Sequence, residues 1–141
     1  MSLFIADTGF IVALLDRHDK HHEWAASHVR AQPAREPYRT CEAALTEASH
    51  LVLRARLRAA DVMALLGDGS FVLDFDLATE QEPVTRFLQK YSDQDADLAD
   101  ACVVRMSELN PRATVLTIDR DFYVYRREDG SDIPVNMPER V

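Results

Sequence analysis

The chain has 141 residues, of which 47% are hydrophobic, and this fits one globular domain (residues 1–141) with a sizeable core. Its 16 basic and 24 acidic residues give a net charge of −8, which argues against a protein that binds duplex nucleic acid through a basic face. No stretch approaches the roughly 20 apolar residues of a membrane span, and the N-terminus lacks the basic region of a signal peptide, so we expect a cytoplasmic protein without a membrane anchor.

Strand and helix patterns alternate along the chain. In chain order we expect a strand at residues 2–6, a helix at 8–15, a helix that opens in the polar stretch 16–23 and continues through Val29, a short strand at 38–40, a helix at 42–52, a short helix at 61–67, a strand at 71–75, helices at 78–91 and 97–109, and a strand at 114–118. Pro33 and Pro37 predict a loop before the second strand. This alternation, without repeats or linkers, predicts a three-layer α/β/α domain with a central parallel sheet flanked by helices.

The two cysteines are not spaced as in a metal site or a redox motif. Cys41 and Cys102 are far apart in the sequence, and no CxxC is present. We therefore expect two core thiols in a protein of the reducing cytoplasm.

Two acidic residues directly follow predicted strands. Asp7 follows the apolar run 3–6, and Asp119 follows the run 115–118. Ligands of open parallel sheets bind beyond the carboxyl ends of the strands. The topology alone therefore predicts that these two carboxylates converge.

Two further acids lie on apolar faces of predicted helices. Glu47 has alanines and Leu51 as its helical neighbours, and Asp100 is followed by the run Ala-Cys-Val-Val. Two carboxylates about 4 Å apart repel by about 4 kcal/mol at an effective dielectric constant near 20. Such acids must be protonated, paired with arginine or bridged by a metal ion, and oxygen ligands favour Mg²⁺ or Mn²⁺ over zinc. A carboxylate-held ion of this kind suggests phosphodiester hydrolysis.

Each acid taken alone also has a purely structural interpretation. Asp7 fits the N-cap of the helix at 8–15, Asp119 fits a turn before Phe122, and Glu47 fits an ion pair with an arginine such as Arg54. The occurrence of all four together favours the metal site.

Four segments of the chain resemble the signature segments of PIN-domain proteins, in particular the VapC-type ribonuclease toxins. They are FIADTGFIVALLD, ALTEASHLV, YSDQDADLADACVV and VLTIDRDF, in the same order as in the family and spread over nearly the whole chain. The resemblance implies a PIN-like domain in which Asp7 and Asp100 bind Mg²⁺, while Glu47 and Asp119 complete the acidic pocket and hold the attacking water or a second ion. Thr8 and Thr117 match the hydroxyl residues that stand beside these acids and support them.

The same resemblance implies an activity and partners. It implies a Mg²⁺-dependent endoribonuclease, with Mn²⁺ as a possible substitute, whose substrate is RNA. It also implies a cognate VapB-type antitoxin that blocks the pocket, and a homodimer of the toxin. We expect an arginine of the antitoxin to dock against the four acids, because a guanidinium group binds carboxylates in a bidentate manner.

Several alternatives remain open or are disfavoured. Asp97 lies one turn from Asp100 and could replace it as a ligand, although its place at the start of a helix favours a role in stabilising that helix end. The cluster of histidines at positions 18, 21 and 22 matches no standard zinc motif. A phosphatase of the haloacid-dehalogenase type requires a second Asp where this chain has Gly9. A PIN-like module that binds RNA or protein without catalysis is the alternative that we retain.

Overall fold

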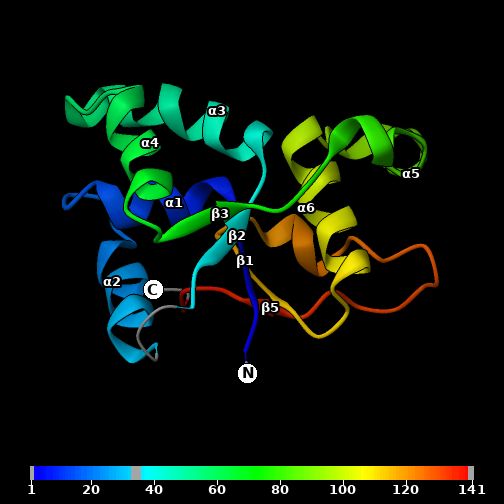
Figure 1. The fold of residues 1–141 in the computed structure, drawn as a ribbon. Helices are drawn as coiled ribbons and strands as arrows, with labels where there is room; N and C mark the ends of the chain where they lie inside the picture. The colour runs from blue at the N-terminus through cyan, green and yellow to red at the C-terminus, as the bar shows by residue number, and fades with distance from the viewer. Residues whose placement is uncertain (1, 33–35, 140–141) are drawn as a thin grey trace.

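Among the residues that the structure describes (2–32 and 36–139), five short strands pair in parallel at the centre of the protein (Figure 1). The structure is a computed structural model. The strands are β1 (Phe4–Ala6), β2 (Tyr38–Thr40), β3 (Phe71–Leu73), β4 (Thr114–Leu116) and β5 (Val135–Asn136), in the spatial order β3-β2-β1-β4-β5. The first four confirm the predicted strands: β2 has the predicted bounds, and β1, β3 and β4 are shorter than predicted. The predicted loop at Pro33 lies outside the described residues.

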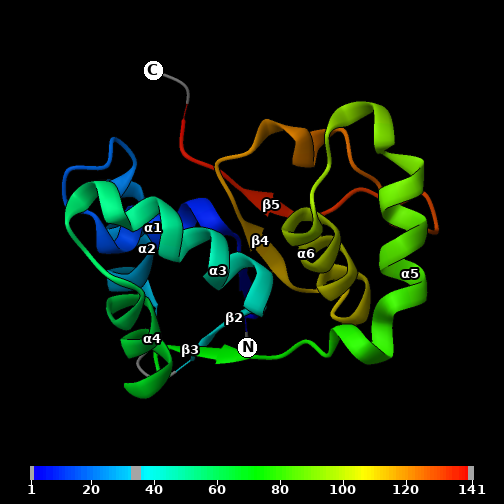
Figure 2. The same ribbon diagram turned by 90° about the horizontal axis from the view of Figure 1, so that it is seen from above.

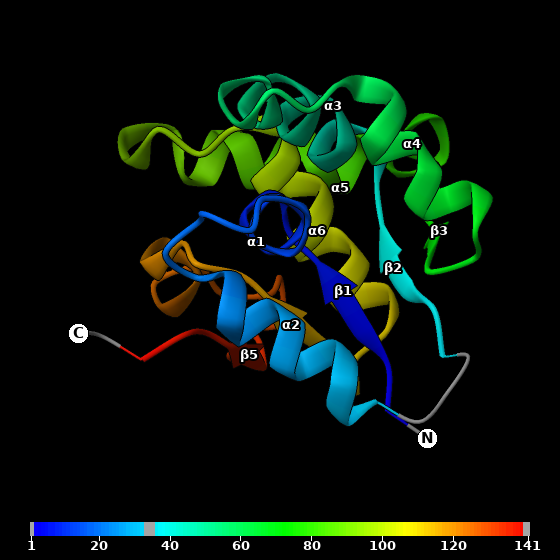
Figure 3. The same ribbon diagram turned by 90° about the vertical axis from the view of Figure 1, so that its left-hand side faces the viewer.

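Helices cover both faces of this sheet, as predicted. They are α1 (Thr8–Leu15), α2 (His22–Ala31), α3 (Glu42–Leu51), α4 (Ala59–Gly67), α5 (Leu77–Lys90) and α6 (Leu98–Leu109), with the short 3₁₀ segments η1 (Val52–Ala55), η2 (Ser92–Gln94) and η3 (Arg120–Tyr123). Figure 3 shows α1 and α2 in front of β1, while α5 and α6 lie on the opposite face of the sheet, as Figure 1 also shows. The chain steps outward from β1 to β2 and β3 and then returns past β1 to β4. Because crossovers between parallel strands are right-handed, this reversal moves the helices to the other face.

Strand β5 is the strand that the sequence did not predict among the described residues. It has two residues and lies between Pro134 and Met137, so no apolar alternation marks it. Its pairing with β4, in which Val135 is opposite Val115, defines it instead.

The core is formed by apolar side chains from the sheet and from the helices on both faces. Phe10, Ile5 and Val103 are fully buried in it. Cys41 and Cys102 are also buried and form no disulfide, which confirms the prediction of core thiols.

The register between β1 and β4 positions the carboxyl ends of both strands at one level. Ile5 is opposite Val115 and Ala6 is opposite Leu116, and the amide of Asp7 donates to the carbonyl oxygen of Leu116 at 3.0 Å. The order in which strands are added reverses between these two adjacent parallel strands, because β1 leads to β2 on one side and β4 is added on the other. Open α/β sheets bind ligands at such a switch point.

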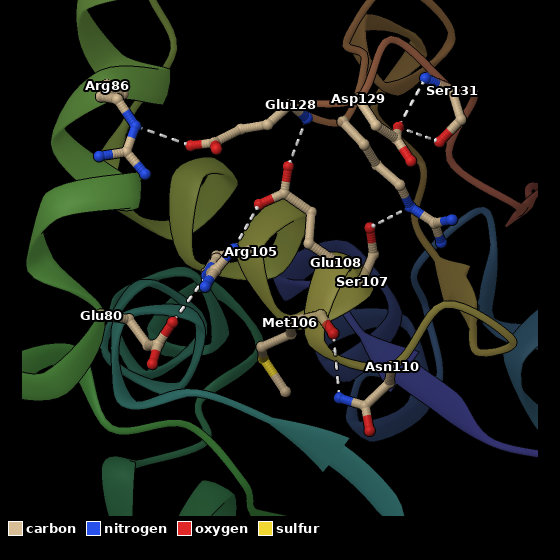
Figure 4. Close-up of polar contacts among 11 residues, drawn as sticks. Glu80, Arg86, Arg105, Met106, Ser107, Glu108, Asn110, Glu128, Asp129 and Ser131 are labelled. Carbon is tan, nitrogen blue, oxygen red and sulfur yellow. Dashed lines mark hydrogen bonds and ion pairs between the residues drawn. The ribbon is translucent and has the colours of Figure 1, made fainter.

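A charged network fastens α5 and the segment after η3 to α6 (Figure 4). The Arg105 guanidinium donates to Glu80 of α5 at 2.7 Å and to Glu108 of its own helix at 3.2 Å. Glu108 also accepts from the backbone amide of Glu128 at 2.6 Å, and Arg86 donates to the Glu128 carboxylate at 2.9 Å. Every carboxylate of this network therefore faces an opposite charge or an amide.

Candidate functional site

One hydroxyl group connects the acids that follow β1 and β4. Thr117 donates from Oγ1 to the Asp7 carboxylate at 2.7 Å, and the same oxygen accepts from the backbone amide of Asp119 at 3.0 Å. Asp7 and Thr117 are buried, because the strand register places them side by side inside the sheet edge. Asp7 also stands at the N-cap of α1, but its side chain makes no cap hydrogen bond. The carboxylate is thus turned towards β4 rather than used as a cap.

Glu47 approaches from α3 through a second hydroxyl. Thr8, the first residue of α1, donates from Oγ1 to Glu47 Oε1 at 2.7 Å. Helices α1 and α3 are in contact, so the residue after Asp7 reaches the middle of α3. The two threonines that the family resemblance placed beside the acids each donate a hydrogen bond to one of these carboxylates.

Asp100 lies in the first turn of α6, and Asp97 is the residue that caps this helix. The Asp97 side chain accepts from the Asp100 amide at 2.9 Å, and Asp100 accepts in return from the Asp97 amide. Asp100 is buried at 9% exposure, whereas Asp97 is exposed. Asp97 therefore has the helix-end role that its position predicted, and Asp100 is the acid that points inward.

Tyr125 is a site residue that the sequence analysis missed. Its side chain is fully buried, and its hydroxyl donates to Asp100 Oδ2 at 2.9 Å. No motif flags it, because it follows the fourth signature segment in a stretch with no regular period. A buried tyrosine requires a hydrogen-bond partner, and here the partner is a carboxylate.

The four acids affect one another electrostatically. The pKa of Asp7 is raised to about 6, mainly by burial; the hydrogen bond from Thr117 lowers it, and the charges of Asp119 and Glu47 also raise it. Burial likewise raises the pKa of Asp100 to about 7, with a contribution from the charge of Asp7. The pKa of Asp119 is raised as well, again mainly by burial. Residues from β1, α3, α6 and the end of β4 thus form a single acidic cluster.

No cation compensates this cluster within the described ranges. None of the ion pairs of residues 2–32 and 36–139 includes Asp7, Glu47, Asp100 or Asp119. The partners of these acids are the neutral hydroxyl groups of Thr117, Thr8 and Tyr125 and backbone amides. Hydroxyl donors orient a carboxylate but leave its charge unneutralised.

The chemistry of these ligands fits a hard divalent cation, although their arrangement is not a closed ligand set. All four groups offer carboxylate oxygens, which Mg²⁺ and Mn²⁺ prefer. In the part of the chain that the structure describes, no three Asp, Glu, His or Cys side chains are close enough to hold one ion together. Each acid instead accepts a hydrogen bond from its own hydroxyl or amide donor.

A cavity elsewhere in the molecule carries no comparable chemistry. A cavity of about 260 Å³ lies between α5, α6 and the segment after η3, and none of the four acids lines it. Its charged walls include Arg86, Arg105 and Glu128, which already pair within the network of Figure 4.

Among the described residues, no helix is long and apolar enough to cross a bilayer.

Comparison with known proteins identifies the fold. No protein-family model matches the sequence, and no curated protein matches it significantly. Six chains of solved structures match, among them the crystal structure of Mycobacterium tuberculosis VapC20, a sarcin-ricin loop cleaving toxin. This structure is similar with a TM-score of 0.74 at 20% sequence identity, over 86% of this chain and 93% of that chain. The five-stranded parallel sheet with helices on both faces is therefore a VapC-type PIN fold, as the four sequence segments predicted.

Proposed function

We propose that this protein is a divalent-metal-dependent endoribonuclease and the toxin of a VapBC-type toxin–antitoxin pair. The observation that carries the proposal is the cluster of Asp7, Glu47, Asp100 and Asp119, which has no cationic partner among the described residues. The cluster lies at the switch point of a VapC-type PIN fold. The activity named for VapC20, cleavage of the sarcin-ricin loop, supports RNA as the substrate class.

In this proposal the four acids have separate tasks. Asp7 and Asp100 hold the ion, while Glu47 and Asp119 orient a water molecule for attack on the scissile phosphate or hold a second ion. A bound Mg²⁺ or Mn²⁺ supplies Lewis-acid stabilisation of the phosphate and lowers the pKa of a coordinated water.

The neighbouring hydroxyl groups fix the directions of the carboxylates. Thr117 restrains Asp7, Thr8 restrains Glu47 and Tyr125 restrains Asp100. A ligand whose orientation is fixed in advance loses less conformational freedom when it binds. We therefore assign these three residues to positioning and the four acids to catalysis.

The proposal includes the partners and location that the family resemblance implies. An antitoxin that presents an arginine would neutralise the cluster without a metal ion, because a guanidinium group pairs with two carboxylate oxygens at once. The toxin itself would form a homodimer. Two buried thiols without a disulfide are compatible with the reducing cytoplasm in which we propose that the pair acts.

The experiment that tests this function maps new RNA ends after total cellular RNA is incubated with the purified protein and Mg²⁺ or Mn²⁺. We expect discrete new ends with the wild type, a loss of at least about 100-fold in cleavage for Asp100→Asn, and no cleavage in excess chelator. Asp95→Asn is the matched control. Asp95 is an exposed acid of the same segment with a φ of 54°, a conformation that Asn adopts readily, so this variant should cleave like the wild type.

Two outcomes would contradict the proposal. Cleavage that survives Asp100→Asn would show that the acidic cluster does not perform the reaction. A folded protein that binds Mn²⁺ and RNA but produces no new ends would instead favour the non-catalytic binding module.

A further inference from the structure

Tyr123 differs from every other tyrosine of the chain. The three others, at positions 38, 91 and 125, are at most 6% exposed, and each has a hydrogen-bonded hydroxyl. Tyr123 is 51% exposed, and its hydroxyl has no hydrogen-bond partner within the described ranges. About half of the Tyr123 side chain is therefore accessible to a ligand.

This ring lies one short turn away from the acidic cluster. Tyr123 is the last residue of η3, the short orange helical turn beyond β4 in Figure 2, and Asp119 is the N-cap of that turn. The Asp119 carboxylate accepts from the amide of Asp121 at 2.9 Å, which fixes the turn against the acid. Because β4 ends at the switch point, η3 projects from the same edge of the sheet as the four acids.

A guanidinium group accompanies the ring. The Arg120 side chain lies over the Tyr123 ring at 5.8 Å from its centroid and donates to the carbonyl oxygen of Pro138 at 2.9 Å. Although Asp119 and Asp121 are its sequence neighbours, Arg120 forms no ion pair with a described carboxylate. The guanidinium is thus held by the Pro138 carbonyl oxygen and the Tyr123 ring, and its charge is not paired with a described carboxylate.

We propose that Tyr123 and Arg120 form a subsite that stacks an unpaired nucleobase and binds an adjacent phosphate of the substrate. Single-stranded RNA is recognised by stacking of splayed bases on aromatic rings and guanidinium planes. A base in a duplex already stacks on its neighbours, so the subsite selects unpaired segments. The proposal rests on the proposed function for the identity of the substrate. It adds the residues that bind the RNA strand next to the acids.

The test measures binding rather than cleavage, in the Asp100→Asn background. One probe is a fluorescein-labelled single-stranded RNA of about 12 randomised nucleotides, a length that one single-strand-binding domain can cover. The other probe has the same backbone with abasic riboses. We expect Asp100→Asn to bind the base-containing probe about ten-fold more tightly than the abasic probe, and Tyr123→Leu to remove most of this preference. Tyr123→Phe keeps the aromatic face and should retain it. Arg120→Gln should weaken the binding of both probes, because both carry phosphates.

Val124→Ala is the matched control, since Val124 is also 51% exposed but has no aromatic face. Equal binding of both probes by the parent protein, or an unchanged preference in Tyr123→Leu, would overturn the stacking subsite. The outcome is separable from that of the proposed function. RNA cleavage with no effect of Tyr123→Leu on binding rejects the subsite alone, and a Tyr123-dependent preference without any cleavage supports the subsite and rejects the nuclease.

Discussion

Two polar clusters of this protein compensate charge in opposite ways. In the network of α5 and α6, the Arg105 side chain is 25% exposed and lies between Glu80 and Glu108, which are 15% and 12% exposed. In the acidic cluster, Asp7 and Asp100 are buried to a similar or greater degree and contact only hydroxyl and amide donors. The first cluster satisfies charge with charge, and the second orients carboxylates without neutralising them.

This difference separates a structural from a functional use of buried acids. In an ion-pair network each charge has a partner, and removing one partner lowers stability because the other charge is left uncompensated. An unmatched acidic cluster reduces stability, because burial and mutual repulsion raise the pKa of its members. Such a loss of folding stability is expected where a bound ligand supplies the positive charge that the protein lacks.

The largest effect should come from the pH dependence of stability without metal. Asp7 and Asp100 have pKa values of about 6 and about 7 in the folded protein, above those of an unfolded chain, so the folded state binds protons more tightly. Stability should therefore rise as the pH falls from 8 to about 5, by about 4 kcal/mol relative to Asp7→Asn/Asp100→Asn. Urea unfolding of both proteins in chelator, at several pH values, measures this difference.

The comparison with the double variant is needed because one group acts in the other direction. Burial lowers the pKa of His28, so its protonation removes stability as the pH falls below about 6.5 in both proteins. A difference that does not depend on pH would contradict the raised pKa values. Addition of Mn²⁺ at pH 8 should stabilise the wild type more than the double variant.

The next effect concerns the compensated network. Arg105→Met leaves Glu80 and Glu108 without their shared cation and should lower the free energy of unfolding by about 2 kcal/mol, less than for a fully buried pair because Arg105 is partly exposed. Arg86→Met is the control, since its pair with Glu128 is about half exposed and should cost less than about 1 kcal/mol. Equal losses in the two variants would show that the network is no stronger than a surface ion pair.

A smaller effect is expected where α1 meets the end of β4. A Cβ atom on Gly9 would lie 2.4 Å from Cγ1 of Ile118, so Ile118 must move in Gly9→Ala. We expect a loss of about 1 kcal/mol in stability, although Ala normally stabilises a helix relative to Gly. Ile118→Ala in the same chain should restore stability, and thermal unfolding of the single and double variants tests this. If Gly9→Ala is as stable as the wild type, the Ile118 side chain moves without a measurable loss of stability.

The smallest effect concerns the hydroxyl that orients Asp100. The hydrogen bond from Tyr125 lowers the pKa of Asp100, so Tyr125→Phe should raise this pKa further and shift the acid limb of the cleavage–pH profile upward by less than about 1 unit. Tyr91→Phe is the control, because the Tyr91 hydroxyl bonds to a backbone amide and not to an acid. An identical profile for both variants would exclude a positioning role for Tyr125.

Features with a strong local pattern could be predicted from the sequence. Asp7 and Asp119 follow short apolar runs, and the carboxyl ends of parallel strands meet at one edge, so their approach follows from topology. Thr8 and Thr117 were placed beside the acids through the family resemblance, and the structure gives each one a carboxylate partner.

The remaining features depend on contacts between distant segments. Strand β5 has two residues and exists through its pairing with β4. Tyr125 reaches Asp100 from 25 residues away, and Arg105 reaches Glu80 across the same separation. No local periodicity records such contacts, because they are set by how α6 packs against its neighbours.

The spread of the four acids along the chain has a consequence for synthesis. Asp7 lies in the first strand made, whereas Asp119 follows β4, and Thr117 joins the two only when β4 pairs beside β1 in the correct register. A slip of two residues would move Asp119 by about 7 Å along the strand and separate the pair. A nascent chain on the ribosome therefore carries no complete acidic cluster until most of its length has emerged and folded. The proposed ribonuclease would thus be inactive towards the RNA of the translation machinery while it is being made.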